Sequence, residues 1–251
     1  MSKSDKVSSA FESPLYRRYQ QIYSEDAETY DRLVSCEDKD DNLLPAIACI
    51  CNFKHKYVVE LGCGTGRLTR KLLPHVKTIH AFDVEVEMIN VAKRYFSEVA
   101  PPNCTFAIAE HSSIPLEDKC ADICIAAWTI NHVLRQEPEL WRERVKEIVK
   151  EMSRILKTDG TIVIVETLGI GVVEPQAPTL KLREYYYFLE GELGFACTWT
   201  RTDYQFESTA EAGKLIGFFF GEELRQAIID HNMVVVPECT GIWSRTSKHR
   251  A

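Results

Sequence analysis

The sequence VVELGCGTGRL combines a carboxylate with closely spaced glycines in a pattern that can hold a ligand. Gly62, Gly64 and Gly66 follow an apolar run and open a helical pattern, so the backbone can turn sharply and approach a ligand closely. Glu60 comes shortly before them, where a carboxylate suits an ammonium group and repels a pyrophosphate. Asp83 lies at the end of the next apolar run, where an acidic residue can bind ribose hydroxyls. These residues predict a site for a nucleoside that carries an ammonium group.

The glycine loop has two other interpretations, a dinucleotide site and a turn that binds no ligand. Dinucleotide-binding folds use a similar loop, but they space the glycines as Gly-x-Gly-x-x-Gly and place a small residue where helix and strand pack closely. This loop reads Gly-x-Gly-x-Gly, Arg67 follows it, and the sequence contains no Tyr-x-x-x-Lys pair. An NAD-dependent oxidoreductase is therefore disfavoured. The other alternative is a glycine turn in an ordinary strand-loop-helix unit that binds nothing.

Composition and charge narrow the class of protein. The formal net charge is -7, and the longest basic cluster is the tail at residues 248–250, so we expect no nucleic-acid partner. No apolar run approaches the roughly 20 residues of a membrane span, and the N-terminus lacks the apolar core of a signal peptide, so we expect a cytoplasmic protein. The nine cysteines are scattered without metal-ligand spacing, which predicts reduced thiols and no metal site.

The elements that must position these residues alternate between strand and helix, which is typical of a parallel sheet with crossover helices. Five apolar runs predict strands at residues 57–61, 78–84, 104–109, 121–128 and 160–167. Helical periodicity lies between them at residues 67–73, 85–99 and 138–156. Further helices are expected before the first strand, at residues 16–33 and 42–51.

The segment after residue 167 departs from this rhythm. We expect an aromatic-rich helix over 180–193, a strand over 198–206 and a helical stretch over 210–231 that Ser208 and Glu211 begin as a capping box. A last strand from Val234, continuing past Pro237 toward Trp243, would finish the sheet as an antiparallel edge. We therefore expect one domain over 1–251, with an N-terminal helical cap at 12–52, a core at 56–167 and a cover with the final strands at 168–251.

From about residue 30 to residue 167 the sequence resembles the class I S-adenosylmethionine-dependent methyltransferases, particularly the small-molecule enzymes that include those of ubiquinone and menaquinone biosynthesis. The first family motif is similar to VVELGCGTGRL, and four later blocks are similar to HAFDVEVEMINVAK, AEHSSIPLEDKCAD, ADICIAAWTINHV and LKTDGTIVIVET. The resemblance implies S-adenosylmethionine as cofactor. It also implies a Rossmann-like α/β fold with a seven-stranded, mostly parallel sheet, helices on both faces and an antiparallel last strand.

The resemblance also implies which residues contact the cofactor. Asp83 would bind the ribose, Glu110 and the backbone of His111 the adenine amino end, and Val84 and Met88 would pack against the adenine ring. Tyr30, in AETYD, would lean over the cofactor as a lid residue. The methionine part would meet the remaining candidates, which are Glu60, Gly62, Cys63, Gly64 and Ala127.

Methyl transfer from a sulfonium is an in-line displacement in which positioning supplies much of the rate. A base is needed only for acceptors such as a hydroxyl or an acidic carbon, and His132, just past the fourth strand, is the best-placed candidate. Its alternative role is to start or cap the next helix. Glu166, at the end of the fifth strand, and Asp31, beside Tyr30, are secondary candidates.

A small-molecule methyl acceptor is the main expectation, because no basic groove or docking appendage is visible in the sequence. The alternatives are a methyltransferase that acts on a protein or an RNA, and a catalytically silent S-adenosylmethionine-binding subunit. The fourth strand is followed by AAWTINHV and not by an NPPY-like sequence, which makes an adenine or glutamine-amide methylase a minor possibility. The sequence does not predict the acceptor atom or the oligomeric state.

Overall fold

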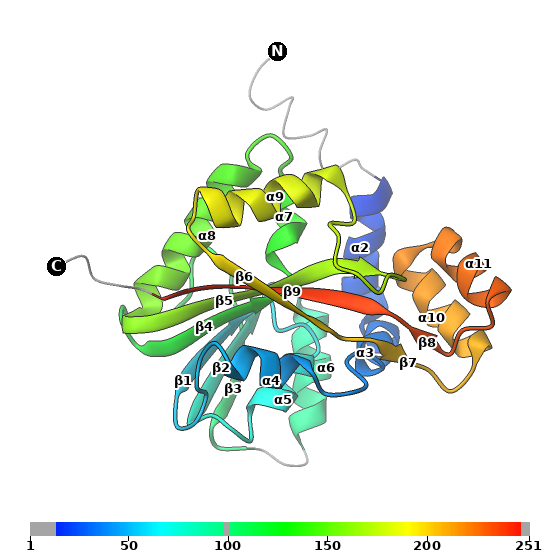
Figure 1. The fold of residues 1–251 in the computed structure, drawn as a ribbon. Coiled ribbons are helices and arrows are strands. Elements are labelled where there is room, and N and C mark those ends of the chain that lie inside the picture. Colours follow the sequence, from blue (N-terminus) through cyan, green and yellow to red (C-terminus); the bar gives the residue numbers. More distant parts are fainter. Residues whose placement is uncertain (1–13, 98–100, 247–251) are drawn as a thin grey trace.

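A seven-stranded sheet runs through the middle of the computed structural model, which describes residues 14–97 and 101–246 (Figure 1). All strands except β9 run in one direction. The predicted Rossmann-like α/β fold with a mostly parallel sheet and an antiparallel last strand is confirmed. In spatial order the strands are β3 (Cys104–Ile108), β2 (Thr78–Asp83), β1 (Tyr57–Leu61), β4 (Ala121–Ala127), β5 (Leu156–Ile170), β9 (Glu238–Thr246) and β6 (Ala196–Arg201).

The predicted place of the last strand at the sheet edge is wrong. β9 lies between β5 and β6 and pairs antiparallel with both, so β6 is the edge. Pro237 has no N–H to donate, and it separates β9 from the short strand β8 (Val235–Val236). β8 pairs instead with β7 (Tyr204–Gln205), so the single strand expected over 198–206 is divided between two sheets.

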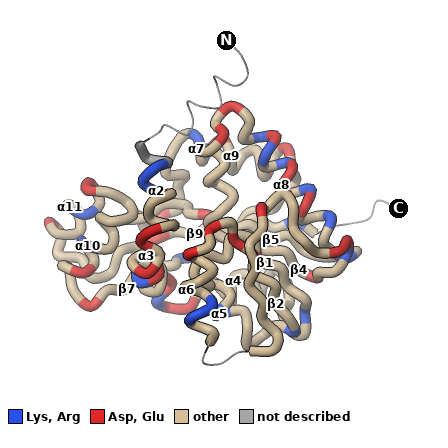
Figure 2. The backbone as a smooth tube through the Cα atoms, turned by 180° about the vertical axis from the view of Figure 1, so that it is seen from behind, with Lys and Arg blue, Asp and Glu red and all other residues tan. Residues whose placement is uncertain are grey.

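One face of the sheet is covered by α8 (Trp141–Ile155) and α9 (Leu180–Gly191). Val59, Cys124 and Ile162 from the strands pack with Val145 of α8 and Tyr185 of α9 in one buried cluster. The outer side of α8 is charged, and acidic and basic positions alternate along it (Figure 2). β5 begins at Leu156, directly where α8 ends and earlier than the predicted start at Gly160.

The opposite face is covered by α4 (Leu43–Ala48), α5 (Arg67–Leu72) and α6 (Val86–Ser97). Val58 and Ile125 of the sheet pack against Ile47 of α4 and Leu72 of α5, all of them buried. The sheet therefore has apolar residues on both faces, as near-continuous apolar strands require. None of the described helices is long and apolar enough to span a membrane.

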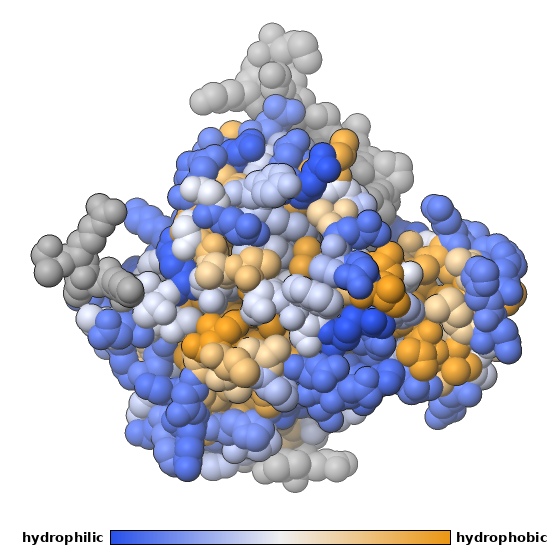
Figure 3. All heavy atoms as spheres, viewed as in Figure 1, coloured by the Kyte–Doolittle hydropathy of each residue, from blue (hydrophilic) through white to orange (hydrophobic). Residues whose placement is uncertain are grey.

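A group of helices closes the carboxyl-end edge of the parallel strands (Figure 1). It consists of α2 (Pro14–Glu25), α3 (Ala27–Ser35), α10 (Thr209–Phe220) and α11 (Glu222–Asp230). Arg18 joins α2 to α10, because its Nη2 donates to the carbonyls of Gly217 and Phe218 at 2.9 and 2.6 Å. Apolar surface gathers over the α10–α11 pair (Figure 3), where Ile229 is 41% exposed. The predicted helical stretch 210–231 is divided at Gly221, whose φ of +104° ends α10.

The predicted start of α10 gives a stability test. The Ser208 Oγ accepts from the Glu211 N–H at 3.2 Å, which satisfies an N–H that the helix itself leaves free. We expect Ser208→Ala to lower the free energy of unfolding by about 1 kcal/mol, as measured by urea denaturation. Ser208→Asp keeps an acceptor at the same place, so it should remain close to the unsubstituted protein. Equal losses in both variants would show that the cap contributes nothing.

Candidate functional site

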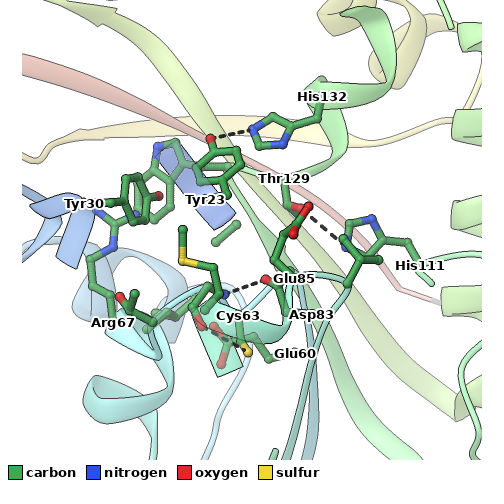
Figure 4. Close-up of a pocket in the computed structure, with 18 of the residues that line it drawn as sticks. Tyr23, Tyr30, Glu60, Cys63, Arg67, Asp83, Glu85, His111, Thr129 and His132 are labelled. Atoms are coloured by element: carbon green, nitrogen blue, oxygen red, sulfur yellow. Dashed lines mark hydrogen bonds between the residues drawn. The ribbon is translucent and has the colours of Figure 1, made fainter. Parts of the chain in front are cut away.

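A cavity of about 390 Å³ lies at the carboxyl ends of β1, β2 and β4, beneath α2 and α3 (Figure 4). Ligands in open α/β sheets bind at this edge of the strands. The structure brings to this one cavity every residue that was predicted to contact the cofactor: Tyr30, Glu60, Gly62, Cys63, Gly64, Asp83, Val84, Met88, Glu110, His111 and Ala127.

The glycine loop forms the floor of the cavity. Gly62 and Gly64 have φ of +64° and +54°, a region that favours glycine. A Cβ on Gly62 would lie 2.2 Å from the Thr129 Oγ1, so the loop after β1 and the loop after β4 touch only because this residue has no side chain. A Cβ on Gly64 would meet only Tyr30, at 3.9 Å. The backbone at Gly64 is therefore open toward the cavity.

Asp83 fixes this loop relative to the end of β2. Its Oδ2 accepts from the Gly64 N–H at 2.8 Å, and its Oδ1 accepts from the Glu85 N–H at 2.9 Å. Each carboxylate oxygen has a second lone pair, so both can still accept from a ligand hydroxyl. The arrangement suits a vicinal diol such as that of a ribose.

Glu60 and Thr65, in and just before the glycine loop, can each form further hydrogen bonds. The buried Glu60 carboxylate accepts from the Thr69 hydroxyl at 2.6 Å, and burial raises the pKa of Glu60 to about 7. The Thr65 Oγ1 is buried without a hydrogen-bond partner among the described residues. Both residues line the cavity. A ligand with an ammonium group and further polar atoms fits them, because it would compensate the burial of these groups.

His132 lies under the N-terminal helices. Its Nε2 is 3.4 Å from the Tyr23 Oη, and the two rings stack with centroids 5.5 Å apart (Figure 4). Burial, with the nearby Arg135 and His111, lowers the pKa of His132 to about 3. The imidazole is therefore neutral and a weak proton acceptor, since an efficient base has a pKa near the working pH. His132 also precedes α7 (Val133–Gln136) as its N-cap, but its side chain makes no capping hydrogen bond.

Glu166 does not reach the cavity. It is fully buried, and its Oε1 accepts from the Asn131 N–H at 3.0 Å and from the Tyr185 hydroxyl at 3.4 Å. Its Oε2 accepts from the Asn131 amide. Glu166 thus holds the short 3-10 helix η1 (Ile130–His132), which carries His132, against β5. This geometry corrects its predicted role as a base, because no acceptor can touch it.

Asp31 is also outside the lining of the cavity. Its Oδ1 accepts from the Arg70 Nη2 at 3.2 Å, which connects α3 with α5. The residue beside it, Tyr30, does line the cavity and packs edge-on against Tyr23 with centroids 5.4 Å apart. Asp31 therefore pairs with Arg70 and does not face the cavity as the predicted base would have to.

Tyr23, Arg67 and Trp128 are among the lining residues that were not predicted from the sequence. The Arg67 guanidinium lies over the Trp128 ring, 3.8 Å from its centroid, and forms an ion pair with the buried Glu37. Trp128 has a φ of +52°, which is strained for a bulky residue and is typical of functional sites. The only sequence signal was position, because Arg67 follows the glycine loop and Trp128 follows β4.

The part of the chain that the structure describes contains no cluster of three or more His, Cys, Asp or Glu side chains able to hold a metal ion. All nine cysteines are free.

Comparisons with known proteins agree with this geometry. Residues 59–164 match a family described as methyltransferase domain. An uncharacterized methyltransferase of Bacillus subtilis, YcgJ, is 28% identical over 145 residues, which cover 57% of this chain and 53% of that protein. The ubiquinone/menaquinone biosynthesis C-methyltransferase UbiE of Campylobacter jejuni is 25% identical over 175 residues, covering 66% of this chain and 65% of UbiE. The chain thus spans about half the length of YcgJ and about two thirds of that of UbiE.

A solved structure shares the fold over most of the chain. It is the Haemonchus contortus phosphoethanolamine N-methyltransferase 2, in complex with phosphomonomethylethanolamine and S-adenosylhomocysteine. The TM-score is 0.61 at 13% identity, and the similarity covers 93% of this chain and 59% of that one. At this identity the likeness establishes the fold.

Glu166 provides a second stability test. Burial raises its pKa to about 7, above the value of an unfolded Glu, so its protonation stabilises the folded state at acid pH and this contribution is lost as the pH rises through about 7. We expect the unfolding free energy of Glu166→Gln, relative to the unsubstituted protein, to rise between about pH 5 and about pH 8. Chemical denaturation at several pH values measures this difference.

A control separates the charge from the hydrogen bonds of Glu166. Glu166→Ala removes the acceptor and leaves Asn131 and Tyr185 unsatisfied, which should cost about 2–3 kcal/mol at every pH. A parallel pH dependence of the Gln variant and the unsubstituted protein would contradict the assignment.

Proposed function

We propose that this chain transfers the S-methyl group of S-adenosylmethionine to a small-molecule acceptor. The premise of this proposal is that residues 59–164 form a class I S-adenosylmethionine-dependent methyltransferase domain. One observation supports the proposal above the others. The residues that the family resemblance assigns to the cofactor come from separate loops, yet all of them line a single cavity.

In the proposed complex each end of the cofactor has its own partners. Asp83 binds the ribose hydroxyls with the oxygens that already hold the loop backbone. Glu60 faces the ammonium group, and the open backbone at Gly64 approaches the methionine part. Glu110 and the backbone of His111 receive the adenine amino end, while Met88 packs on the ring. Val84, Cys63, Gly62 and Ala127 complete the wall, and Tyr30 covers it from α3.

The bound cofactor supplies a methyl group on a cationic sulfur, which is an electrophile with a good leaving group. The residues of this chain then have to align an acceptor with that methyl group and exclude water, and such positioning can supply a large share of the rate. Tyr23 and Tyr30 close the cavity from above. His132 accepts a hydrogen bond from the acceptor and so orients it, a role that its low pKa permits.

The proposed location is the cytoplasm. The nine free cysteines support a reducing compartment, because disulfides form mainly in oxidising ones.

Calorimetric titration tests the cofactor assignment. We expect S-adenosylhomocysteine to bind and NAD to bind weakly or not at all. Asp83→Ala should weaken the binding of S-adenosylhomocysteine by about 1–3 kcal/mol, because it removes charge-assisted hydrogen bonds to the ribose. Glu87→Ala is the matched control. It also removes a carboxylate, but Glu87 is exposed at the start of α6 and does not line the cavity. Equal affinity of the two variants, or tight NAD binding alone, would contradict the proposal.

A labelling experiment tests the acceptor class. The protein is incubated with methyl-labelled S-adenosylmethionine and a cell extract, and the products are separated by ultrafiltration. We expect the label in the small-molecule filtrate. Label that stays with protein or RNA would favour a macromolecular acceptor, and no label above a heat-inactivated blank would favour a silent cofactor-binding subunit.

A further inference from the structure

The wall of the cavity is strongly acidic. Carboxylates line it at five positions: Glu60, Asp83, Glu85, Glu110 and Glu137. Arg67 is the only Lys or Arg among the described residues of the lining. Burial lowers the pKa of both lining histidines, His111 and His132, so neither adds positive charge near neutral pH. Glu60, Asp83 and Glu110 are assigned to the cofactor, and Glu137 pairs with Arg144 at 2.8 Å, so Glu85 is the carboxylate that remains to disfavour an anionic acceptor.

Arg67 offsets little of this charge, because its guanidinium is shared with a buried carboxylate. It forms an ion pair with Glu37, whose side chain is 3% exposed, and it stacks on Trp128. The Oε2 of Glu37 also accepts from the Tyr204 hydroxyl at 3.0 Å, which helps to hold the carboxylate in place. Moving Arg67 away from Glu37 would leave that carboxylate buried as an unpaired charge, which is strongly unfavourable, so the guanidinium stays beside Glu37.

Three aromatic rings lie together at the pocket (Figure 4). Tyr23, Tyr30 and His132 line it, and we name these three residues the aromatic wall. Tyr23 stacks on His132 and packs edge-on against Tyr30. Phe219 of α10 supports both tyrosines from behind, with centroids 6.4 and 5.4 Å away. Aromatic faces attract a cation that is otherwise desolvated.

We propose that the acceptor is a small, uncharged amine whose nitrogen lies against the aromatic wall; this rests on the proposed function. The nitrogen lone pair forms the N–C bond, and the C–S bond breaks with its electron pair going to sulfur. The positive charge thereby moves from sulfur to nitrogen, and the methylated nitrogen keeps this charge as an ammonium group. The amine attacks with its own lone pair, so it needs no strong base, in keeping with the weakly basic His132. The aromatic wall and the acidic lining stabilise the charge that arises on nitrogen.

Chemical analysis of the labelled small-molecule product tests the proposal. We expect the label to be retained by a cation exchanger at about pH 7 and to survive treatment with base, because an N-methylated amine is cationic near neutrality and stable to hydrolysis. Label released by base as volatile methanol would identify a methyl ester, and a neutral or anionic product that survives base would identify an O- or C-methylated compound. Either result would overturn the inference and leave the proposed function intact. No labelled product at all would count against both.

Binding of a product-like cation gives a readout that does not depend on turnover. Choline is titrated into the protein loaded with S-adenosylhomocysteine, alongside its uncharged isostere, in which a tert-butyl group replaces the trimethylammonium group. We expect choline to bind about tenfold more tightly than the isostere. Equal affinities, or no detectable binding of choline, would overturn the proposal.

Two variants locate this preference on the aromatic wall. Tyr23→Leu removes a ring that lines the cavity and should abolish most of the preference for the cation, with little change in the affinity for S-adenosylhomocysteine. Tyr187→Leu is the matched control, because Tyr187 lies on α9 with 67% of its surface exposed and does not line the cavity. If both variants keep the full preference, the aromatic wall is not where the cation binds and the proposal is wrong.

Discussion

One carboxylate holds the ligand cavity in shape. Asp83 receives the Gly64 N–H and the Glu85 N–H, and so it joins the loops that follow β1 and β2. This contact acts together with two backbone hydrogen bonds of the loop, from the Gly66 N–H to the Cys63 carbonyl at 2.9 Å and from the Cys63 N–H to the Phe82 carbonyl at 3.0 Å. With the loop fixed, Gly62 can meet Thr129 and the end of β4 comes to lie beside it. The floor of the cavity is therefore preorganised, which reduces the ordering that a ligand has to impose when it binds.

Hydrophobic runs predicted the parallel part of the sheet well, because strands buried on both faces must be apolar at nearly every position. The same logic could have placed β9 inside the sheet. Ile242 and Trp243 are adjacent, both are buried, and they contact opposite faces. β6 lacked such a signal, since most of its residues are exposed, and its position beside β9 depends on backbone pairing that hydropathy does not record.

The two halves of the site differ in how far the sequence predicts them. The cofactor half is built from short motifs at strand ends, and chain proximity alone brings those residues to one edge of the sheet. The other half depends on contacts between distant segments, such as Arg67 with Glu37 and Tyr23 with His132. Glu166 shows where prediction of the site from the sequence ends. It was predicted at the end of the fifth strand, but β5 continues to Ile170, and the side chain is sealed against Asn131 and Tyr185.

The hydrogen bond between Arg18 and the carbonyl of Gly217 joins residues 199 positions apart. It connects α2, which covers the cavity, to α10. Contacts of such sequence separation form late, because the loop between them must close first. During synthesis the strands that carry the glycine loop and Asp83 leave the ribosome well before α10 does. A nascent chain therefore displays the floor of its binding site before α10 can brace the helices that cover it, and most of the contacts assigned to the cofactor are available at that stage.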